Sequence, residues 1–528
     1  MLVQAILVGI WAGIAGVDKL VLQTHIHRPI VTGLIVGLIL GDVNTGLITG
    51  ATLELVWIGA VAIGGAQPPN VVIGGVIGTA LAIITKSDPQ VTVGLAVPFA
   101  VAAQALITLL YTAMSPIMHK FDAYAKKADT RGIERMSSFL PIVLFICYFF
   151  VVFLCIFFGA DKASSFISIL PEWSIHGLSV AGGMMPAVGF AMLLKTMWET
   201  SYAPFFIFGF VMAAYLGLDT LAVAGLAVAI ALYEFYAQRN NTVTASNNNG
   251  GFGLKKMASE ETYNDTISEK VITKKELKKI MFRSYLLQSS FNYERMQAGG
   301  WTYSLIPGLK KIHRDKEDLA LSLENHLQFM NTNPQLVTFM HGVIIAMEES
   351  KESPQSIQAI KTALMGPLGG IGDALFYLTV LPIAAAIGSQ LSLEGNILGP
   401  IVFLLLFNIP YMAAKIGLIN LGYKMGVKAI SVLSESTKKL SRSATIVGIS
   451  VVGALIPKSV QLTTTFVFRL KDTKLDLQTQ LFDTIMPNLL PLVFTLFCFI
   501  MLKKGRTPIA LIIFTVIFGL LGSLIGII

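Results

Sequence analysis

Apolar runs of the length needed to cross a lipid bilayer recur along almost the whole chain. A helical span needs about 20 predominantly apolar residues, and many of the runs approach that length. Several are short or interrupted by glycine and proline, so they do not give a count of spans. The runs lie near residues 2–17, 29–40, 46–62, 71–85, 92–116, 138–160, 178–198, 203–236, 361–390, 396–422, 443–457, 485–502 and 507–528. We predict an all-α polytopic membrane protein with broken and re-entrant helices.

Charge is scarce, which supports this class. Of the 528 residues, 54% are hydrophobic and 13% are charged, about half the ~25% of charged residues in soluble domains. The net charge of +8 is best explained by lysines and arginines that flank membrane spans. An ordinary soluble enzyme, a disordered regulator and a nucleic-acid-binding module are excluded. Cys147, Cys155 and Cys498 lie in apolar runs and are too few for a disulfide framework or a metal site.

The sequence changes character between residues 237 and 283. Asn, Ser, Thr and Gly dominate from Asn240 to Gly253, which is typical of a flexible linker. The polar stretch after Met257 resembles a fresh N-terminus, as if two membrane proteins were joined end to end; one protein with a long loop is the alternative. We predict a membrane domain at 1–239, a polar linker at 240–273 and a second domain at 274–528, divided into an amphipathic helical subdomain at 274–357 and a membrane part at 358–528.

Positive charge gathers in four segments, and cytoplasmic loops of membrane proteins carry an excess of Lys and Arg. We therefore predict that these segments face the cytoplasm. They are residues 119–135, the linker, residues 310–316 and residues 503–506.

The segment from Glu54 to Asn70 places polar groups inside an apolar run. Pro68 and Pro69 cannot continue a helix, because proline lacks the amide donor and clashes with the preceding turn. Broken helices at membrane depth often form transporter binding sites. Glu54, Gln67 and Asn70 would then offer hydrogen-bond partners to a polyhydroxylated ligand. A simple loop between two spans explains the pattern equally well.

Asp18 is the other early charge at membrane depth, and Lys19 follows it. A role in a site and a structural ion pair with a Lys or Arg are both open. Gly182–Pro186 resembles the first Gly/Pro break, which hints at an inverted repeat. Gly33, Gly37 and Gly41 are spaced four apart, so we expect them to allow close helix packing.

The second half has two polar patches of its own. In Phe291–Gly300, helical spacing puts Glu294 one turn from Gln297 on one face, and Arg295 is expected to form a structural ion pair. Met365–Asp373 is a Gly/Pro-rich segment that ends in a carboxylate. It lacks the Lys-Ser/Thr of a phosphate-binding loop, so we predict the tip of a re-entrant hairpin there.

No motif indicates a catalytic centre in this chain. All seven histidines are expected to be structural or interfacial, and the known nucleophile, zinc and paired-cysteine motifs are missing. We therefore assign no catalytic residue, no metal ligand and no cofactor.

Several strings match a known family of permeases. In the first half they are Arg28-Pro29, Gly41-Asp42, Thr45–Gly50, Gln67–Asn70, Ala181–Gly183 and Pro186–Gly189. In the second half they are Phe291–Gln297, Asn331–Pro334, Gly366-Pro367 and Gly372-Asp373. With these strings the first half resembles the IIC component, and the second half the IID component, of the mannose family of bacterial phosphotransferase-system (PTS) permeases. The chain looks like a IIC–IID fusion.

The resemblance implies group translocation across the bacterial cytoplasmic (inner) membrane by a multi-pass protein. IIC and IID would form the sugar path, while soluble IIA and IIB pass phosphate from phosphoenolpyruvate to the sugar. No phosphorylated histidine is then expected in this chain. The family implies a homotrimer of IIC–IID pairs within the lipid, with sugar held between a core domain and a mobile domain. Lys126, Lys127 and Arg131 are candidates for docking IIB.

Carried over by motif, the candidate sugar-binding residues come from both halves. They are Asp18, Glu54, Gln67, Asn70, Glu294, Gln297 and Asp373. The strings Gly16–Asp18, Gln67–Asn70 and Ala298–Gly300 favour N-acetylgalactosamine or galactosamine, with mannose, glucose, fructose and sorbose open. The alternatives are an ion-coupled secondary sugar transporter that uses Asp18 and Glu54 as coupling carboxylates, and a receptor or passive channel.

Overall fold

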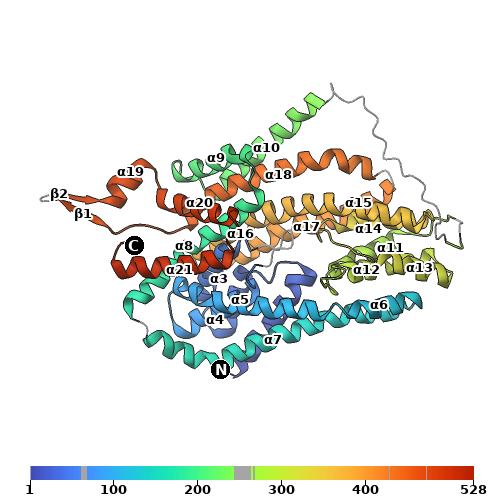
Figure 1. The fold of residues 1–528 in the computed structure, drawn as a ribbon, viewed down its shortest axis with the longest axis horizontal. Coiled ribbons are helices and arrows are strands. Elements are labelled where there is room, and N and C mark those ends of the chain that lie inside the picture. Colours follow the sequence, from blue (N-terminus) through green and yellow to red (C-terminus); the bar gives the residue numbers. More distant parts are fainter. Residues whose placement is uncertain are drawn as a thin grey trace.

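The computed structural model describes residues 2–60, 68–169, 171–242, 263–265, 268–426, 429–470 and 473–528. Within these residues the fold is almost entirely helical (Figure 1). Seven helices are long and apolar enough to cross a membrane, and an eighth span results if the pair Gln478–Ile485 and Leu489–Lys503, bent by 64°, is counted. The predicted all-α polytopic membrane class is confirmed. A hairpin of two antiparallel strands, β1 (Val467–Leu470) and β2 (Thr473–Asp476), is the exception that we did not predict.

The helices of the first half follow the predicted apolar runs closely. They are α1 (Leu2–Val17), the π-helix η1 (Asp18–Leu22), α2 (Pro29–Leu40), α3 (Val43–Trp57), α4 (Val71–Thr85), α5 (Pro89–Ala113), α6 (Ile117–Lys126), α7 (Thr130–Ile169), α8 (Glu172–Met197), η2 (Thr200–Tyr202), α9 (Ala203–Ala214) and α10 (Thr220–Thr242). Caps set several boundaries. Asp42 accepts from the Thr45 amide at 3.0 Å at the start of α3, and Asp88 accepts from the Gln90 amide before α5.

The second half begins with short helices and continues with long ones. They are α11 (Lys274–Arg283), η3 (Ser284–Leu286), α12 (Ala298–Ile312), α13 (Lys316–His326), α14 (Val337–Glu349), α15 (Pro354–Gly372), the π-helix η4 (Asp373–Val380), α16 (Leu381–Leu393), α17 (Leu398–Met425), α18 (Ala429–Ser459), η6 (Gln478–Phe482), α19 (Asp483–Ile485), α20 (Leu489–Lys503) and α21 (Pro508–Ile525). Helices α11 to α14 are not among the candidate spans found in the described residues.

Two predicted helix breaks are wrong. Residues 182–186 lie inside the continuous helix α8, where the glycines serve packing: a Cβ on Gly182 would lie 2.2 Å from the Gln90 carbonyl oxygen. Residues 365–373 are not a hairpin tip, because α15, η4 and α16 run on without a break. Pro367 removes only its own amide, and the helix widens into the π-helix at Asp373.

The predicted glycine packing between α2 and α3 is largely confirmed. A Cβ on Gly33 would lie 2.3 Å from the Gly46 carbonyl oxygen, so the two backbones are in direct contact. Gly41 has another role, since it ends α2 with a φ of 88°.

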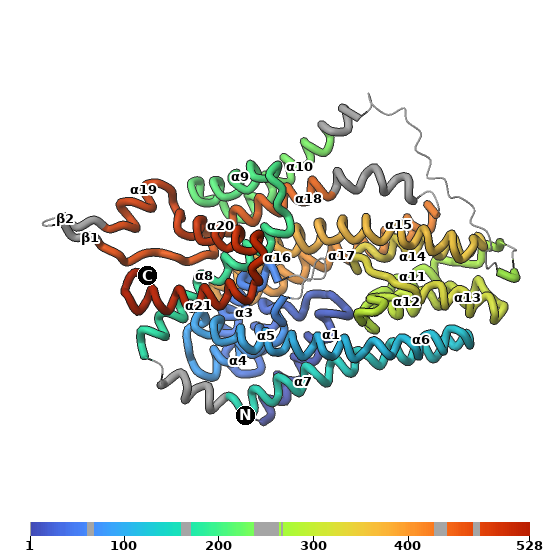
Figure 2. Tube along the Cα trace, viewed as in Figure 1, coloured from blue at the N-terminus to red at the C-terminus, as the bar shows by residue number. Residues whose placement is uncertain are grey.

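The two halves are interleaved rather than set side by side. Helix α18 packs on α9 and α10, α20 and α21 pack on α8, and α16 packs on α3. Figures 1 and 2 show α6 and the start of α7 at one end of the molecule together with α11 to α13, and the β1–β2 hairpin at the opposite end. Two of the predicted cation-rich segments, residues 119–135 and 310–316, contribute to that first end, while most of the linker lies outside the described residues.

The helical cluster α11–α14 has a charged centre. The carboxylate of Glu348, fully buried, accepts from His313 Nε2 at 2.7 Å, from His326 Nε2 at 2.9 Å, from Ser322 Oγ and from the hydroxyl of Tyr263. All of these groups belong to the second half except Tyr263, which lies in the predicted linker. We call this set of five residues the Glu348 centre.

Candidate functional site

The backbone between α1 and α2 is irregular, and the carboxylate of Asp18 accepts several of its hydrogen bonds. Asp18 opens η1 and is fully buried. Its Oδ1 accepts from the amide and the hydroxyl of Thr24 at 2.8 and 2.6 Å, and its Oδ2 accepts from His27 Nδ1 at 2.7 Å. Gln23 and His25 have φ values of 53° and 65°, a conformation that costs energy for residues other than glycine. We call residues 18–28 the Asp18 loop.

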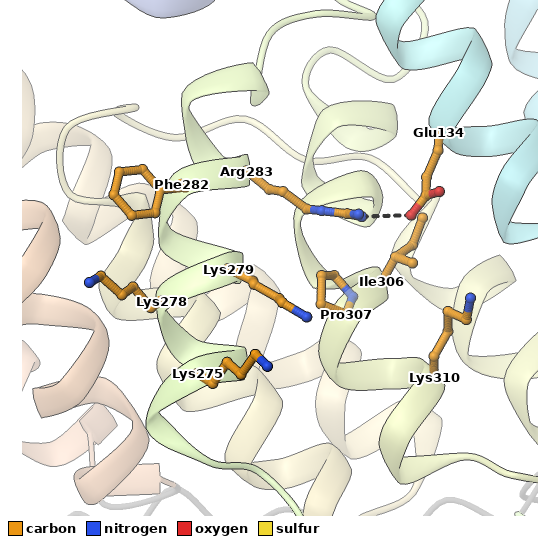
Figure 3. Close-up of a pocket in the computed structure, with 9 residues that line it drawn as sticks. All are labelled: Glu134, Lys275, Lys278, Lys279, Phe282, Arg283, Ile306, Pro307 and Lys310. Carbon is orange, nitrogen blue, oxygen red and sulfur yellow. Dashed lines mark hydrogen bonds and ion pairs between the residues drawn. The ribbon is translucent and has the colours of Figure 1, made fainter.

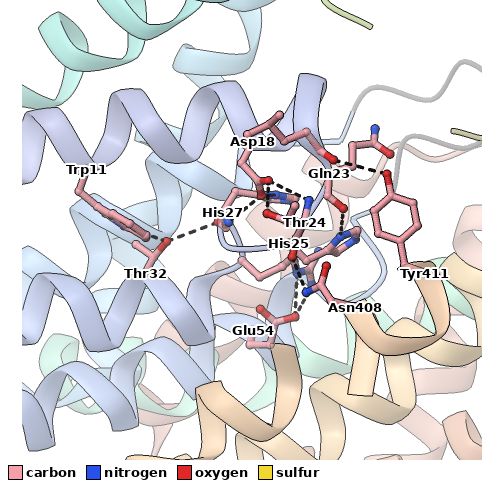
Figure 4. A network of polar contacts seen from close by, with 12 residues as sticks. Trp11, Asp18, Gln23, Thr24, His25, His27, Thr32, Glu54, Asn408 and Tyr411 are labelled. Carbon is pink, nitrogen blue, oxygen red and sulfur yellow. Dashed lines mark hydrogen bonds and ion pairs between the residues drawn. The ribbon is translucent and has the colours of Figure 1, made fainter. Parts of the chain in front are cut away.

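The Asp18 loop ends in a buried ion pair. Arg28 donates through Nε and Nη2 to Glu54 Oε1 at 2.8 and 2.5 Å, and also to the Trp57 carbonyl oxygen at 3.3 Å. Both side chains are buried. The pair joins the loop to the last turns of α3, next to the segment that leads into the Pro68-Pro69 break. Figure 4 shows Asp18, His27 and Glu54 gathered around the loop.

Asn70 lies at the far side of that break and caps α4. Its Oδ1 accepts from the amides of Val72 and Ile73, both at 3.2 Å. Its Nδ2 donates to the Tyr148 hydroxyl at 2.7 Å and lies 3.5 Å from Gln104 Oε1. Residues 68–70 are not helical, as the proline pair predicts, and Gln67 lies outside the described residues.

A second set of polar contacts joins Asn70 to the Asp18 loop. Lys19 donates to Gln104 Oε1 at 3.3 Å, and the same oxygen faces Asn70. Lys19 therefore does not pair with Asp18, and neither does Arg28. The predicted Asp–Lys or Asp–Arg alternative for Asp18 is wrong, because the loop turns back and presents His27 instead.

The second half contributes side chains that meet the Asp18 loop directly. Gln335 Nε2 donates to Gln23 Oε1 at 3.2 Å, and the Tyr377 hydroxyl donates to the same oxygen at 2.8 Å. Asn408 donates through Nδ2 to the Thr24 carbonyl oxygen at 2.9 Å. The ring of His25 lies 3.7 Å from that of Phe407, centroid to centroid. Side chains from α17, from η4 and from the segment before α14 thus contact the loop, and Figure 4 shows Asn408 and Tyr411 of α17 beside it.

Two predicted residues of the second half, Asp373 and Gln297, hold the backbone next to Gln335. Asp373 Oδ1 accepts from Asn333 Nδ2 at 2.9 Å, and Asn333 Oδ1 accepts from the amide of Gln335 at 2.9 Å. The side chain of Gln297 forms two hydrogen bonds with the backbone of Thr332: it donates to the carbonyl oxygen at 2.9 Å and accepts from the amide at 3.0 Å. Asp373 and Gln297 therefore hold the segment that presents Gln335.

Glu294 lies apart from this set. Residues 291–297 form a turn closed by a bridge between Asn292 and Met296 rather than a helix, because Asn292 Oδ1 accepts the amides of Glu294 and Arg295. The prediction that Glu294 and Gln297 share a helical face is wrong. The carboxylate of Glu294 is partly exposed and pairs with Arg295 Nε at 3.4 Å. Arg295 also binds Asp122 of α6 at 2.6 and 2.9 Å, which confirms its predicted structural role.

The structure thus brings Asp18, Glu54 and Asn70 into one polar region and places Gln297 and Asp373 directly behind it. Sequence reasoning missed the residues that make the contact between the halves, which are Gln23, Thr24, Gln335, Tyr377 and Asn408. One signal pointed to Gln335, since it follows the Asn331–Pro334 string. His25 lies at the interface between the halves, against Phe407. Among the described residues no group of three or more His, Cys, Asp or Glu could hold a metal ion.

Family models match both halves of the chain. Residues 2–233 match the model described as PTS system sorbose-specific IIC component, and residues 271–528 match PTS system mannose/fructose/sorbose family IID component.

Individual relatives agree with these models. The second half is 38% identical over 269 residues to the fructose permease IID component of Bacillus subtilis (strain 168), covering 49% of this chain and 98% of that protein. The first half is 37% identical over 224 residues to N-acetylgalactosamine permease IIC component 1 of Escherichia coli (strain K12), covering 42% of this chain and 84% of that protein. The solved structure of the mannose transporter ManYZ with microcin E492 matches at 33% identity, over 49% of this chain and 99% of that one, with a TM-score of 0.29. The chain belongs to the mannose/fructose/sorbose family of PTS sugar permeases and carries the IIC and IID components in one polypeptide.

Proposed function

We propose that the contact between the Asp18 loop and the IID half is the place where the permease holds its sugar. The protein is a multi-pass membrane permease of the phosphotransferase system, whose membrane components work with sugar and with the IIA and IIB proteins. In this proposal Gln23, Gln335, Tyr377 and Asn408 contact the sugar. Asp18, Asn333 and Asp373 position the backbone that carries them.

The observation that carries the proposal is the set of hydrogen bonds that cross between the halves at Gln23. Amide and hydroxyl groups from both components converge there, on backbone that is irregular on the IIC side. The Oε1 atom of Gln335 is buried and lacks a hydrogen-bond partner among the described residues. A buried acceptor without a hydrogen-bond partner is uncommon. In this proposal a sugar hydroxyl donates to it.

The chemistry suits a polyhydroxylated ligand. When the two halves part, the bonds among Gln23, Gln335 and Tyr377 become available, and sugar hydroxyls replace them one for one. Sites that hydrogen-bond a hydroxyl strongly reject analogues that lack it, because the protein group is then left unpaired. Polar groups at membrane depth are costly unless they are satisfied, so the same bonds close the path between the halves when no sugar is present.

The phosphate is brought by IIB, and this chain presents the sugar hydroxyl to it. Phosphoryl transfer needs in-line positioning and charge stabilisation. Lys126 and Lys127, exposed at the end of α6, are the proposed docking contacts for IIB. Their replacement by Gln should lower IIB-dependent phosphorylation at low salt and leave sugar binding unchanged, measured by phosphorylation rate against IIB concentration and by equilibrium binding of labelled sugar. An unchanged dependence on IIB would remove this docking contact.

The proposed substrate is N-acetylgalactosamine or galactosamine. The E. coli relative of the IIC half is an N-acetylgalactosamine permease component, while the B. subtilis relative of the IID half belongs to a fructose permease. A panel of amino sugars and hexoses in vesicles with IIA, IIB and phosphoenolpyruvate decides between them. Preference for fructose would overturn the assignment of the sugar and leave the site standing.

The site is tested by Gln335→Ala, with Gln328→Ala as the matched control, since Gln328 is exposed. We expect Gln335→Ala to raise the sugar concentration for half-maximal phosphorylation at least tenfold, and the control to leave it unchanged. Glu294→Gln is measured alongside, because Glu294 stays a predicted sugar contact. Normal phosphorylation in Gln335→Ala would place the sugar elsewhere. Mass measurement of the purified complex tests the proposed trimer of chains.

A further inference from the structure

A cation-lined groove runs along the outside of α7 where α11 and α12 meet it. Two hollows, of about 640 and 660 Å³, are both lined by one ion pair, Arg283 to Glu134 at 2.8 Å. Figure 3 shows the first hollow, with Glu134 reaching from α7 and with Lys275 and Lys279 of α11 on the same side as Arg283, while Lys278 points the other way. We call the two hollows together the α7 groove.

Positive charge dominates the lining of the α7 groove. Seven cations face one carboxylate, Glu134, which Arg283 already neutralises. The cations are Arg131, Arg135, Lys275, Lys278, Lys279, Arg283 and Lys310. Apart from Arg283, none of them forms an ion pair with another described residue. The groove therefore offers several unpaired cations to an anionic group.

The same face of α7 turns apolar within two helical turns. Arg131, Arg135, Phe139 and Ile142 recur at the spacing of one helical face, and Ser138, Phe139 and Ile142 line the second hollow beside the arginines. Phe139 is 53% and Ile142 is 55% exposed. Both lie in the most apolar of the candidate spans, Thr130–Gly159, and only 22% of the apolar 18-residue window of that span is buried inside the protein. The groove thus passes directly from cations to a lipid-facing surface.

We propose that the α7 groove binds an anionic phospholipid. The headgroup phosphate lies among Arg131, Arg135 and the lysines of α11, and the acyl chains lie along Phe139 and Ile142. Basic pockets at the bilayer surface select anionic lipid headgroups in this way. A soluble acidic partner matches the cations but not Phe139 and Ile142, which are contiguous with the span. A phospholipid matches both ends of the groove.

The bound lipid would join the two components. Arg131 and Arg135 belong to the IIC half, while Lys275, Lys279 and Lys310 belong to the IID half. A phosphate between them relieves the repulsion among like charges and adds a contact to the Arg283–Glu134 pair. A ligand that binds only the folded protein raises its stability, so anionic lipid should raise the melting temperature of the whole chain.

The test uses the full chain purified in a neutral detergent. Binding of phosphatidylglycerol and of phosphatidylcholine is measured by native mass spectrometry and by the shift in melting temperature. We compare the wild type with Arg131→Gln/Arg135→Gln and with Lys126→Gln/Lys127→Gln, which removes the same charge from the neighbouring helix outside the groove. We expect phosphatidylglycerol to bind at least tenfold tighter than phosphatidylcholine. We expect the arginine pair to lose at least fivefold in affinity, and the lysine pair to stay within twofold.

Three results would overturn the proposal. The first is equal binding of the two lipids by the wild type. The second is unchanged phosphatidylglycerol binding in the arginine variant, with its fold checked by circular dichroism. The third is displacement of the lipid by glycerol 3-phosphate at equal concentration, which would show that a free phosphate site needs no acyl chains. If the arginine variant loses response to IIB but keeps the lipid, the groove is a protein-docking surface instead.

Discussion

Two clusters bury carboxylates in this permease, and they are built in different ways. In the Glu348 centre, one carboxylate of α14 is held by three side chains of the IID half, on α13 and at the end of α12, and by Tyr263 of the linker. In the Asp18 loop, the carboxylate holds irregular backbone with left-handed residues, and its neighbours continue into the other component through Gln23 and Thr24.

The difference indicates which of the two clusters can open without exposing an unpaired charge. A buried carboxylate with every oxygen paired inside one helical cluster can only stabilise that cluster, since opening it exposes an unpaired charge. The Asp18 loop keeps its charges paired within the IIC half, at His27 and Arg28, and meets the IID half through neutral amides, a hydroxyl and a carbonyl. Neutral hydrogen bonds contribute only about 0.5–1.5 kcal/mol each, so this contact can part and reform during transport.

Glu54→Gln should have the largest effect. It leaves the guanidinium of Arg28 buried without a counter-charge, which costs about 3–5 kcal/mol of stability, and it loosens the Asp18 loop. We expect sugar phosphorylation to be lost and the melting temperature to fall, both measured on the purified protein.

The double variant Arg28→Met/Glu54→Leu sharpens this prediction. Replacing a buried ion pair by apolar side chains of similar volume is often neutral for stability, so the melting temperature should recover. Phosphorylation should not recover, because the loop has lost its anchor. Near-normal phosphorylation in the double variant would make the pair purely structural.

Glu348→Gln should also cost about 3–5 kcal/mol of stability, because several buried donors lose an ionised acceptor and hydrogen bonds to a charged group contribute about 1.5–3 kcal/mol each. Here the comparison predicts the opposite outcome for function. The phosphorylation rate per folded molecule should equal that of the wild type, provided that it is measured well below the lowered melting temperature. A changed half-saturating sugar concentration would show that the Glu348 centre is coupled to the sugar path.

The stability of the Glu348 centre should also depend on pH. Burial would raise the pKa of Glu348, but hydrogen bonds from His313 and His326 outweigh it and hold that pKa below its ordinary value. Burial lowers the pKa of His326. Both groups therefore bind fewer protons in the folded chain than in the unfolded chain, so stability falls as the pH drops below about 6.5 for the histidine and about 4.3 for the carboxylate.

We expect this loss to amount to about 1.4 kcal/mol for each proton and pH unit. Melting temperatures of the wild type and Glu348→Gln should stay apart between pH 7 and 5 and converge as the pH falls below about 4.3, because only there does the unfolded carboxyl bind a proton that the folded one does not. Glu324→Gln, which changes an exposed carboxylate, serves as the control. Its melting temperature should change with pH in the same way as that of the wild type. A constant gap between the wild type and Glu348→Gln would contradict the assigned ionisation.

Tyr377→Phe should have the smallest effect. It removes only the hydroxyl that donates to Gln23, a loss of about 0.5–1.5 kcal/mol. We expect the sugar concentration for half-maximal phosphorylation to rise about two- to tenfold, with the melting temperature nearly unchanged. A large fall in melting temperature without a change in half-saturation would mean that this hydroxyl supports the fold and not the sugar.

Much of the fold follows from local pattern. The apolar runs at 29–40 and 71–85 coincide with α2 and α4 to the residue, because the residues at their ends are helix caps and breakers: Pro29 and Gly41 for one, Asn70 and Lys86 for the other. The same local logic failed at Gly182–Pro186 and at 365–373. At Gly182 the backbone of α5 packs against the glycine and α8 stays continuous, whereas at 365–373 the helix continues through Pro367 and widens into η4.

In the candidate site, too, some features could be predicted from the sequence and others could not. The residue types of Asp18, Glu54 and Asn70 at membrane depth already marked them in the sequence, since buried polar groups are costly and need a reason. The hydrogen-bond partners in this region could not be inferred from the sequence. Gln335 lies 312 residues from Gln23. Asp18 contacts His27 rather than Lys19 or Arg28 because of the path that the loop takes. The sequence by itself determines which polar groups need a hydrogen-bond partner at membrane depth. The tertiary structure decides which groups become those partners. The reason is that a hydrogen bond requires contact at about 3 Å, and spacing along the chain does not specify such a contact between distant residues.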